Sequence, residues 1–345
     1  MLDDFNLIAQ RDPQGALEVA ANQWNQANVD IEIVDGSHDG REVKQVVIAG
    51  MGGSALSALL AKNWLEGELD IPVEVVRSYD LPSYVGFNTL VIASSYSGNT
   101  EETVSCYDQA MARGAQVSVI ASGGALIQKA EHDGVARVIV PGGMQPRMTT
   151  IQGLRALLKV YAHFGVTDEG YYDKIASYSD WLKEEVSQWT KDISTDRNAA
   201  KQVALYSVGK SPVFYAGHVM SPVAYKWKIS WNENSKNIAF YNELPEFNHN
   251  EFMGWTSHPV HKPYAIFDLL SDFEHERTRR RFEVTDRLLS GLRPRAHIIN
   301  LRGDSIIAQM MWASVLADFA SIYTAVLNGV NPTPVDLIEK FKAEL

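Results

Sequence analysis

The sequence is poor in cysteine, in positive charge and in long apolar runs. Its single cysteine, Cys106, excludes an intrachain disulfide and favours a reducing cytoplasm as the natural setting. The formal net charge of -11 argues against a nucleic-acid partner, because a phosphate backbone requires a basic face. The one dense basic run, residues 277–281, is flanked by glutamates and is typical of a solvated helix face.

Several other features are missing as well. No apolar run approaches the length of a membrane span, so no membrane association is expected. Residues 1–5 have no basic region before an apolar core and do not resemble a signal peptide. The chain has no Gly-x-Ser-x-Gly elbow, no His-Glu-x-x-His motif and no Walker lysine. His258 and His261 could suggest a metal pair, but the proline between them favours a loop.

The first half of the chain alternates short apolar segments with helical patterns. The expected strands are residues 45–50, 72–78, 89–95, 116–122 and 136–142, and the expected helices are 55–65, 100–113 and 125–132. Near-continuous apolar strands alternating with helices predict a parallel sheet that is covered on both faces. Cys106 falls inside one of these helices and is expected to be a small core residue.

The second half repeats this alternation. Amphipathic helices at residues 150–164 and 171–190 are expected to bridge to a second unit. Its expected strands are 213–217, 238–241, 263–270 and 297–302, and its expected helices start near Pro222 and span 274–289, 306–327 and 334–345. Residues 48–54 and 215–221 form a weak internal repeat: each has a strand, Ala-Gly, three residues and Ser. The second copy lacks the paired glycines, so its turn could hold structure without holding phosphate.

Two turns after expected strands carry the groups that phosphate binding needs. Residues 50–54 contain Gly52 and Gly53, which have no Cβ and let a ligand approach the backbone closely. Residues 94–103 place three hydroxyls where a strand ends and a helix begins: Ser95, Ser97 and Thr100. Free N–H groups at a helix N-terminus bind anions, and helix capping explains one hydroxyl, not three. Because parallel strands end at the same edge of a sheet, the two turns can converge on one ligand.

A second polar stretch covers residues 231–236 and 242–252. It places carboxylates, amides and a histidine between aromatic residues, which is expensive to bury and typical of a reacting pocket. Four carboxylates in it are possible bases, and the pattern alone does not choose among them: Glu233, Glu243, Glu246 and Glu251.

These motifs resemble known ones. Residues 52–54 together with 95–100 are similar to the phosphate-binding motif of the sugar isomerase (SIS) domain. Residues 232–236 and the run Pro-Glu-Phe-Asn-His-Asn-Glu at 245–251 resemble the bifunctional phosphoglucose/phosphomannose isomerases. The second resemblance is far more specific than the first, and it covers nearly the whole chain.

The resemblance implies roles for individual residues. Phosphate would be bound by Gly52, Gly53, Ser54, Ser95, Ser97 and Thr100. Glu233 would be the base, and His249, reaching in from the partner subunit, would act in ring opening. Arg147 would stabilise the intermediate. A family lysine near the C-terminus corresponds best to Lys342, with Lys340 as a near alternative.

The resemblance also implies a fold and an activity. The fold would be α/β with two SIS subdomains, residues 1–153 and 154–345, each a mainly parallel sheet flanked by helices in an α-β-α sandwich. The protein would be a cytoplasmic homodimer that uses neither metal nor cofactor. It would interconvert glucose 6-phosphate with fructose 6-phosphate through a cis-enediol. Thr333 lies near the place of a family threonine linked to the use of mannose 6-phosphate.

Three rival functions have sequence signatures of their own. A non-catalytic SIS sugar-phosphate sensor usually carries a DNA-binding helix, and no basic recognition helix precedes Gln45. A SIS amidotransferase needs a nucleophilic cysteine where this chain has Leu2. A nucleotide-binding oxidoreductase needs a Gly-x-Gly-x-x-Gly turn, which the glycines at 50, 52 and 53 do not complete.

Overall fold

The computed structural model describes residues 1–36, 38–257 and 263–344, and it divides into two compact units. One unit is Gln23–Asp180, and the other joins Met1–Asn22 to Trp181–Leu345. This grouping by contacts differs from the expected subdomain limits, because the first 22 residues pack with the second half of the chain. The subdomain boundary after residue 153 stays a prediction. The histidine pair His258 and His261 lies outside the described residues.

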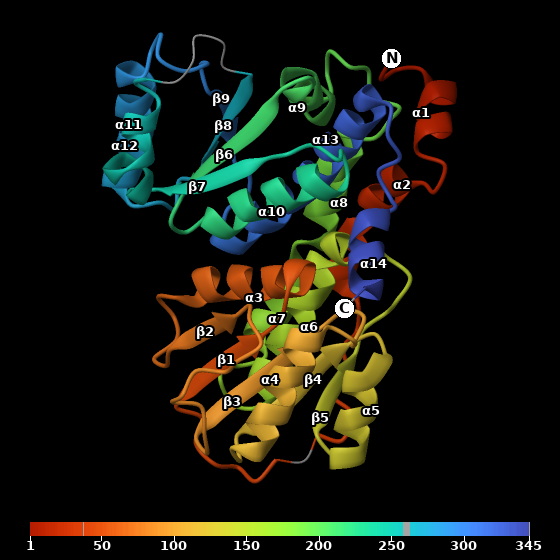
Figure 1. The fold of residues 1–345 in the computed structure, drawn as a ribbon, viewed down its shortest axis with the longest axis vertical. Coiled ribbons are helices and arrows are strands. Elements are labelled where there is room, and N and C mark those ends of the chain that lie inside the picture. Colours follow the sequence, from red (N-terminus) through yellow and green to blue (C-terminus); the bar gives the residue numbers. More distant parts are fainter. Residues whose placement is uncertain (37, 258–262, 345) are drawn as a thin grey trace. The chain divides into compact units, whose positions relative to one another are not determined.

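The unit Gln23–Asp180 is built on a five-stranded parallel sheet in the order β2-β1-β3-β4-β5 (Figure 1). Its elements are η1 (Gln23–Asn28), β1 (Gln45–Ala49), α3 (Gly52–Leu65), β2 (Val73–Val76), β3 (Thr89–Ser94), α4 (Glu101–Ala112), β4 (Gln116–Ala121), α5 (Gly124–Asp133), β5 (Ala136–Ile139), η2 (Pro146–Met148), α6 (Thr150–His163) and α7 (Gly170–Ser177). The central strands are apolar and buried along most of their length, which explains why they form a sheet covered on both faces.

The strand order of this sheet reverses between β1 and β3. Ala49 at the end of β1 pairs with Val76 of β2 on one side and with Ala93 of β3 on the other. Helices α4 and α5 cover one face, where Cys106 is buried as expected and burial raises the pKa of its thiol to about 11. Ligands of such sheets bind beyond the carboxyl ends of the two strands at the reversal. The turns with the predicted phosphate motifs follow these two strands.

The second unit contains a four-stranded parallel sheet in the order β7-β6-β8-β9 (Figure 1). Its elements are α1 (Phe5–Arg11), α2 (Ala16–Ala21), α8 (Ser179–Ser187, which begins at the boundary), α9 (Ala199–Ser207), β6 (Ser211–Gly217), α10 (Ser221–Glu233), β7 (Phe240–Leu244), η3 (Glu246–His249), α11 (Glu251–Gly254), β8 (Tyr264–Leu270), α12 (Glu276–Leu288), β9 (His297–Asn300), α13 (Ile306–Asn328) and α14 (Asp336–Ala343). Its strands follow the same order as β2-β1-β3-β4, so the predicted α/β architecture of two parallel sheets with flanking helices is confirmed.

The expectation that no apolar run reaches the length of a membrane span is wrong, because of helix α13. It has 23 residues and, among the described helices, is the one long and apolar enough to cross a bilayer. However, 94% of its most apolar window is buried inside the protein. A helix that is apolar on all sides is found either in a membrane or in the centre of a large core. Here it is a core helix, packed against α9 and α10.

The expected strands all form, but the helices were predicted less well. The single helix expected over residues 171–190 is wrong, because α7 ends at Ser177 and α8 begins at Ser179. Serines lie on both sides of the break: Ser177 Oγ donates to the Lys174 carbonyl at 2.7 Å, and Ser179 Oγ accepts from Asn28 Nδ2 at 2.6 Å. Helices α1, α2 and α9 were not predicted. Asp4, whose carboxylate accepts from two backbone N–H groups, is the signal that marks the start of α1.

Asp268, in the middle of β8, makes the stability of the fold depend on pH. Burial raises the pKa of its carboxyl to about 7, against the attraction of Arg293. The folded state therefore binds this proton more tightly than the unfolded chain, and stability is lost as the pH rises from about 4 to about 7. We expect Asp268→Asn to remove this loss. Urea unfolding at about pH 5 and about pH 8 measures the free energy of unfolding of both proteins. If the variant lost as much stability between the two pH values as the wild type, Asp268 would not be the cause.

Candidate active site

The turn between β3 and α4 contains hydroxyls with two different orientations. Ser95 is only 1% exposed, shares a hydrogen bond of 2.8 Å with Thr100 Oγ1, and accepts one from the Gly98 N–H at 3.1 Å. Ser97 is exposed, and its Oγ accepts from the Asn99 N–H at 3.3 Å. Ser95 therefore fixes the shape of the turn, while Ser97 presents its hydroxyl to the outside. The N-terminus of α4 follows directly and favours an anion at this place.

The turn after β1 is joined directly to this turn. Ser54 Oγ accepts a hydrogen bond from the Tyr96 N–H at 2.9 Å. Gly50 allows the close approach, because a Cβ at this position would lie 2.8 Å from the Ser94 carbonyl oxygen. The structure thus brings together the two turns that the sequence predicted to converge, at the reversal between β1 and β3.

The two paired glycines have different surroundings. A Cβ on Gly53 would lie 2.6 Å from the Pro146 carbonyl oxygen and 3.0 Å from the Arg147 nitrogen. Gly52 has a φ of 51°, and a Cβ there would meet no atom within 4 Å. The missing side chain at Gly53 is therefore explained by backbone packing, which the sequence did not predict. The space beside Gly52 stays open for a ligand.

Arg147 lies in η2, directly against the start of α3. Its side chain is 1% exposed, and Nη1 donates to Gln145 Oε1 at 3.1 Å. Thr149 Oγ1 donates to the Pro146 carbonyl at 2.9 Å and holds the short helix closed. A guanidinium is costly to bury unless it is paired, and this one lies beside the two turns.

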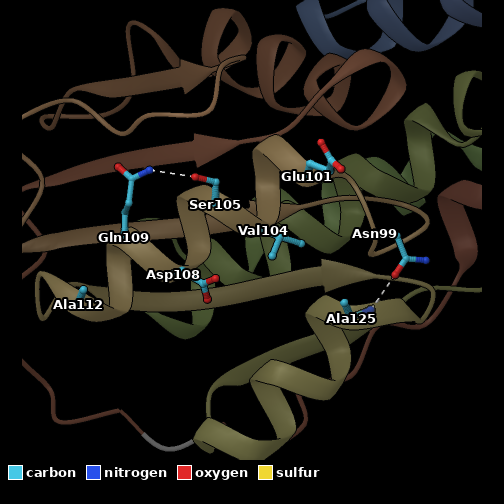
Figure 2. Close-up of a pocket in the computed structure, with 8 residues that line it drawn as sticks. All are labelled: Asn99, Glu101, Val104, Ser105, Asp108, Gln109, Ala112 and Ala125. Atoms are coloured by element: carbon cyan, nitrogen blue, oxygen red, sulfur yellow. Dashed lines mark hydrogen bonds between the residues drawn. The ribbon is translucent and has the colours of Figure 1, made fainter. Parts of the chain in front are cut away.

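A large open hollow on the surface of this unit lies elsewhere. It is an open groove of about 710 Å³ along α4 and α5, lined by Asn99, Glu101, Val104, Ser105, Asp108, Gln109, Ala112 and Ala125 (Figure 2). Its charged lining consists of two carboxylates, Glu101 and Asp108, which would repel a phosphate. Asn99 Oδ1 accepts from the Ala125 N–H at 2.9 Å, so this side chain joins α5 to the Ser95–Thr100 turn. The groove does not suit an anionic substrate.

In the second unit, the four candidate bases differ in their surroundings. The Glu251 carboxylate accepts from Tyr215 Oη and, at 2.7 Å, from Asn242 Nδ2. Glu246 Oε1 accepts from Asn250 Nδ2 at 2.5 Å. These two carboxylates hold the segment between β7 and α11 in place. Glu233 is half-buried at the last position of α10, and Glu243 is half-buried in β7.

His249 ends the short helix η3 and is exposed. Its neighbours are fixed: Phe247 is buried, and Asn248 Nδ2 donates to Thr285 Oγ1 at 2.9 Å. The imidazole of His249 is therefore exposed on a segment whose neighbouring residues are held in place.

The two candidate C-terminal lysines lie on α14. Lys342 Nζ forms an ion pair of 3.0 Å with Glu339 on the same helix, and both Lys342 and Lys340 are exposed. Thr333 precedes the helix, and its N–H donates to Asn331 Oδ1 at 3.0 Å. The geometry of α14 does not choose between the two lysines.

The turn after β6, the second copy of the internal repeat, is filled by a carboxylate of the chain itself. Glu274 Oε1 accepts from the Met220 N–H at 2.9 Å, and Oε2 accepts from the Val219 N–H at 3.3 Å. Gly217 leaves room for this carboxylate, because a Cβ there would lie 2.2 Å from its carbon. Burial raises the pKa of Glu274, and the bonds from the two N–H groups lower it. The amides that hold anions in such a turn are thus already occupied.

Among the described residues, no group of three or more His, Cys, Asp or Glu side chains is arranged to hold a metal ion.

Two family models match the chain. One, described as the bacterial phospho-glucose isomerase C-terminal SIS domain, matches residues 196–345, and the SIS domain model matches residues 41–139. The chain is 37% identical to a bifunctional phosphoglucose/phosphomannose isomerase of Caldicellulosiruptor bescii, over 88% of this chain and 90% of that protein. It is 34% identical to the enzyme of the same name from Aquifex aeolicus, with the same coverage.

The fold is also found among solved structures. A hypothetical protein from Thermus thermophilus superposes with a TM-score of 0.73, covering 98% of this chain and 92% of that one at 15% identity. At this identity the likeness establishes the fold.

Proposed function

The chain belongs to the bifunctional phosphoglucose/phosphomannose isomerase family, and we propose that it interconverts glucose 6-phosphate and mannose 6-phosphate with fructose 6-phosphate. The observation that carries this function is the pair of joined turns at the β1/β3 reversal with the buried Arg147 beside them. That arrangement offers backbone N–H groups, an exposed hydroxyl and a cation to an anionic sugar. A non-catalytic sugar-phosphate sensor is the alternative.

In this proposal the phosphate is held by the two turns. Ser97 and Thr100 donate hydroxyl hydrogen bonds, and Ser54, Gly52 and Gly53 contribute from the start of α3. Ser95 contributes through the shape of the turn, because its own hydroxyl is buried and bonded to Thr100. The N-termini of α3 and α4 add the attraction of their dipoles.

The proton is moved by Glu233. Isomerisation removes the proton from carbon 2 of the aldose and returns it to carbon 1, so one carboxylate suffices if the intermediate is a cis-enediolate. A general base of this kind accelerates the step by about 10² to 10⁴. Arg147 stabilises the charge that develops on the enediolate oxygen. His249 assists opening of the sugar ring, and Lys342 or Lys340 contributes a second cation.

We further propose that the protein acts in the cytoplasm as a homodimer, in which His249 serves the site of the partner subunit. Its exposure on a fixed segment supports this role. Mixing inactive Glu233→Gln chains with inactive His249→Ala chains should then regenerate a fraction of active sites. Recovered turnover supports the shared site, and a mixture that stays inactive after subunit exchange contradicts it.

One coupled assay tests the function. The purified protein is offered glucose 6-phosphate and mannose 6-phosphate separately, and fructose 6-phosphate is measured. We expect turnover of glucose 6-phosphate, and activity should survive exhaustive treatment with EDTA because the proposed chemistry uses only side chains. Tight binding of both sugars without turnover of either would favour the sensor.

Ser97→Ala should raise the KM for fructose 6-phosphate by about tenfold or more, because a hydrogen bond to a charged group contributes about 1.5–3 kcal/mol. Ser187→Ala, which removes an exposed hydroxyl from α8, is the matched control and should leave KM unchanged. Steady-state kinetics of both variants measure the KM for fructose 6-phosphate. An unchanged KM in folded Ser97→Ala protein would remove this turn from the substrate site.

A further inference from the structure

Three successive residues of the turn that follows Glu233 form hydrogen bonds to α13 or to the segment after it. Asn234 is completely buried, and its Nδ2 donates to Ser321 Oγ at 2.8 Å. The Ser235 carbonyl accepts from Asn328 Nδ2, the last residue of α13, at 3.3 Å. Lys236 Nζ donates to the Pro332 carbonyl at 3.1 Å, in the segment that leaves α13. The end of α10 is therefore fastened to the whole C-terminal part of α13 and to the chain beyond it.

The ammonium of Lys236 donates three hydrogen bonds in this turn. Its Nζ also donates to the Glu233 carbonyl at 2.6 Å and to the Asn234 carbonyl at 3.4 Å. The carbonyls at a helix C-terminus lack partners within the helix, and a cation is favoured there by the helix dipole. One ammonium thus joins the last turn of α10, which carries Glu233, to the segment that leads into α14.

The backbone at Lys236 adds an independent observation. Its φ is 54°, in the left-handed region that side chains other than glycine rarely adopt. Such a conformation persists only where the surroundings enforce it. At Lys236 those surroundings include the three carbonyl groups that accept hydrogen bonds from Nζ.

The rest of α10 is fixed to α13 as well. Lys226 and Asp318 form a fully buried ion pair of 2.6 Å, to which Ser230 Oγ adds a hydrogen bond of 2.9 Å. These bonds set how α10 lies along α13. The residues after Glu233 add further bonds at the end of the helix.

We propose that Lys236 is a positioning residue: its ammonium clasps the Glu233 end of α10 to the segment before α14, and so orients the base relative to the C-terminal lysine. The inference rests on the proposed function for the role of Glu233, but the clasp itself is a property of the fold. Lys236 touches backbone carbonyls in this arrangement. Its loss should therefore lower kcat and leave the affinity for substrate nearly unchanged.

Three variants and a control test the proposal. Lys236→Met keeps the aliphatic stem and removes the ammonium, whereas Lys236→Gly also relieves the left-handed backbone and so protects folding. Lys236→Arg keeps a cation that can reach carbonyl groups. Lys129→Met removes a lysine of an exposed ion pair on α5 and controls for loss of charge. For each, kcat and KM are measured together with amide hydrogen exchange over residues 230–237 and 328–343.

We expect Lys236→Met and Lys236→Gly to lower kcat by at least about tenfold, to change KM by less than about threefold, and to speed exchange in both segments. Lys236→Arg should restore slow exchange and most of kcat, and Lys129→Met should match the wild type. Unchanged exchange in the Met and Gly variants would overturn the clasp. Faster exchange with unchanged kcat, or a loss confined to KM, would overturn the positioning role. If the wild-type protein had no isomerase activity, the proposed function would be wrong. The hydrogen-exchange data would then test only whether Lys236 joins the end of α10 to the segment before α14.

Discussion

Replacing Glu233 with glutamine should lower kcat by at least about 10² while leaving substrate binding nearly intact, because the amide keeps the shape of the side chain and removes its basicity. Two rival carboxylates, Glu251 and Glu246, accept hydrogen bonds from Asn242 and Asn250 and hold the segment between β7 and α11. Steady-state kinetics with glucose 6-phosphate and fructose 6-phosphate measure the effect.

The rival carboxylates supply the control for this experiment. Glu251→Gln should weaken the hold on the segment that carries His249 and should affect closed-ring sugars more than the proton transfer itself. Near-wild-type turnover by Glu233→Gln, together with an inactive Glu243→Gln or Glu246→Gln enzyme, would show that another residue is the base.

Replacing Arg147 with methionine should lower kcat by about 10² to 10³, the cost of removing one preorganised group that stabilises a developing oxyanion. The guanidinium is 1% exposed, so its orientation does not have to be set during the reaction. Methionine is shorter but unbranched like the arginine stem, and it fills part of the same space, which limits collapse of the site. Kinetics, with a thermal unfolding curve to confirm folding, provide the measurement.

Gly53→Ala offers a second way to disturb Arg147 without touching its side chain. The added Cβ would lie 2.6 Å from the Pro146 carbonyl oxygen, so η2 has to move. We expect kcat to fall by at least about tenfold with a smaller change in KM. Full activity in Gly53→Ala together with full activity in Arg147→Met would remove η2 from the mechanism.

The strands and the convergence of the two turns could be predicted from the sequence because their signals are local. A strand buried on both faces is a short apolar run, and residues 45–50 and 89–95 correspond closely to β1 and β3. Parallel strands must end at one edge of a sheet, so the convergence of the following turns followed as well. Short helices such as α2 and α9 have weaker patterns, and tertiary packing decides whether they form.

The roles of single residues within the motifs depended on contacts that are distant in the sequence. Ser95 and Ser97 look equivalent in the sequence, but one is buried against Thr100 and the other is exposed. Gly53 is predicted to bind phosphate, and its missing side chain also makes room for a carbonyl more than ninety residues away. Glu274 had no recognisable motif, although it fills the turn after β6.

By itself, the sequence determined the α/β class, the two parallel sheets, the family and the set of polar residues proposed for the site. These follow from periodicity and from residue order, which are properties of neighbouring positions. Only the tertiary structure decided which hydroxyl is exposed, which carboxylates are already bonded, and that Lys236 joins the end of α10 to the segment beyond α13. Such facts depend on side chains from separate elements meeting within hydrogen-bond distance, and no local pattern in the chain encodes that meeting.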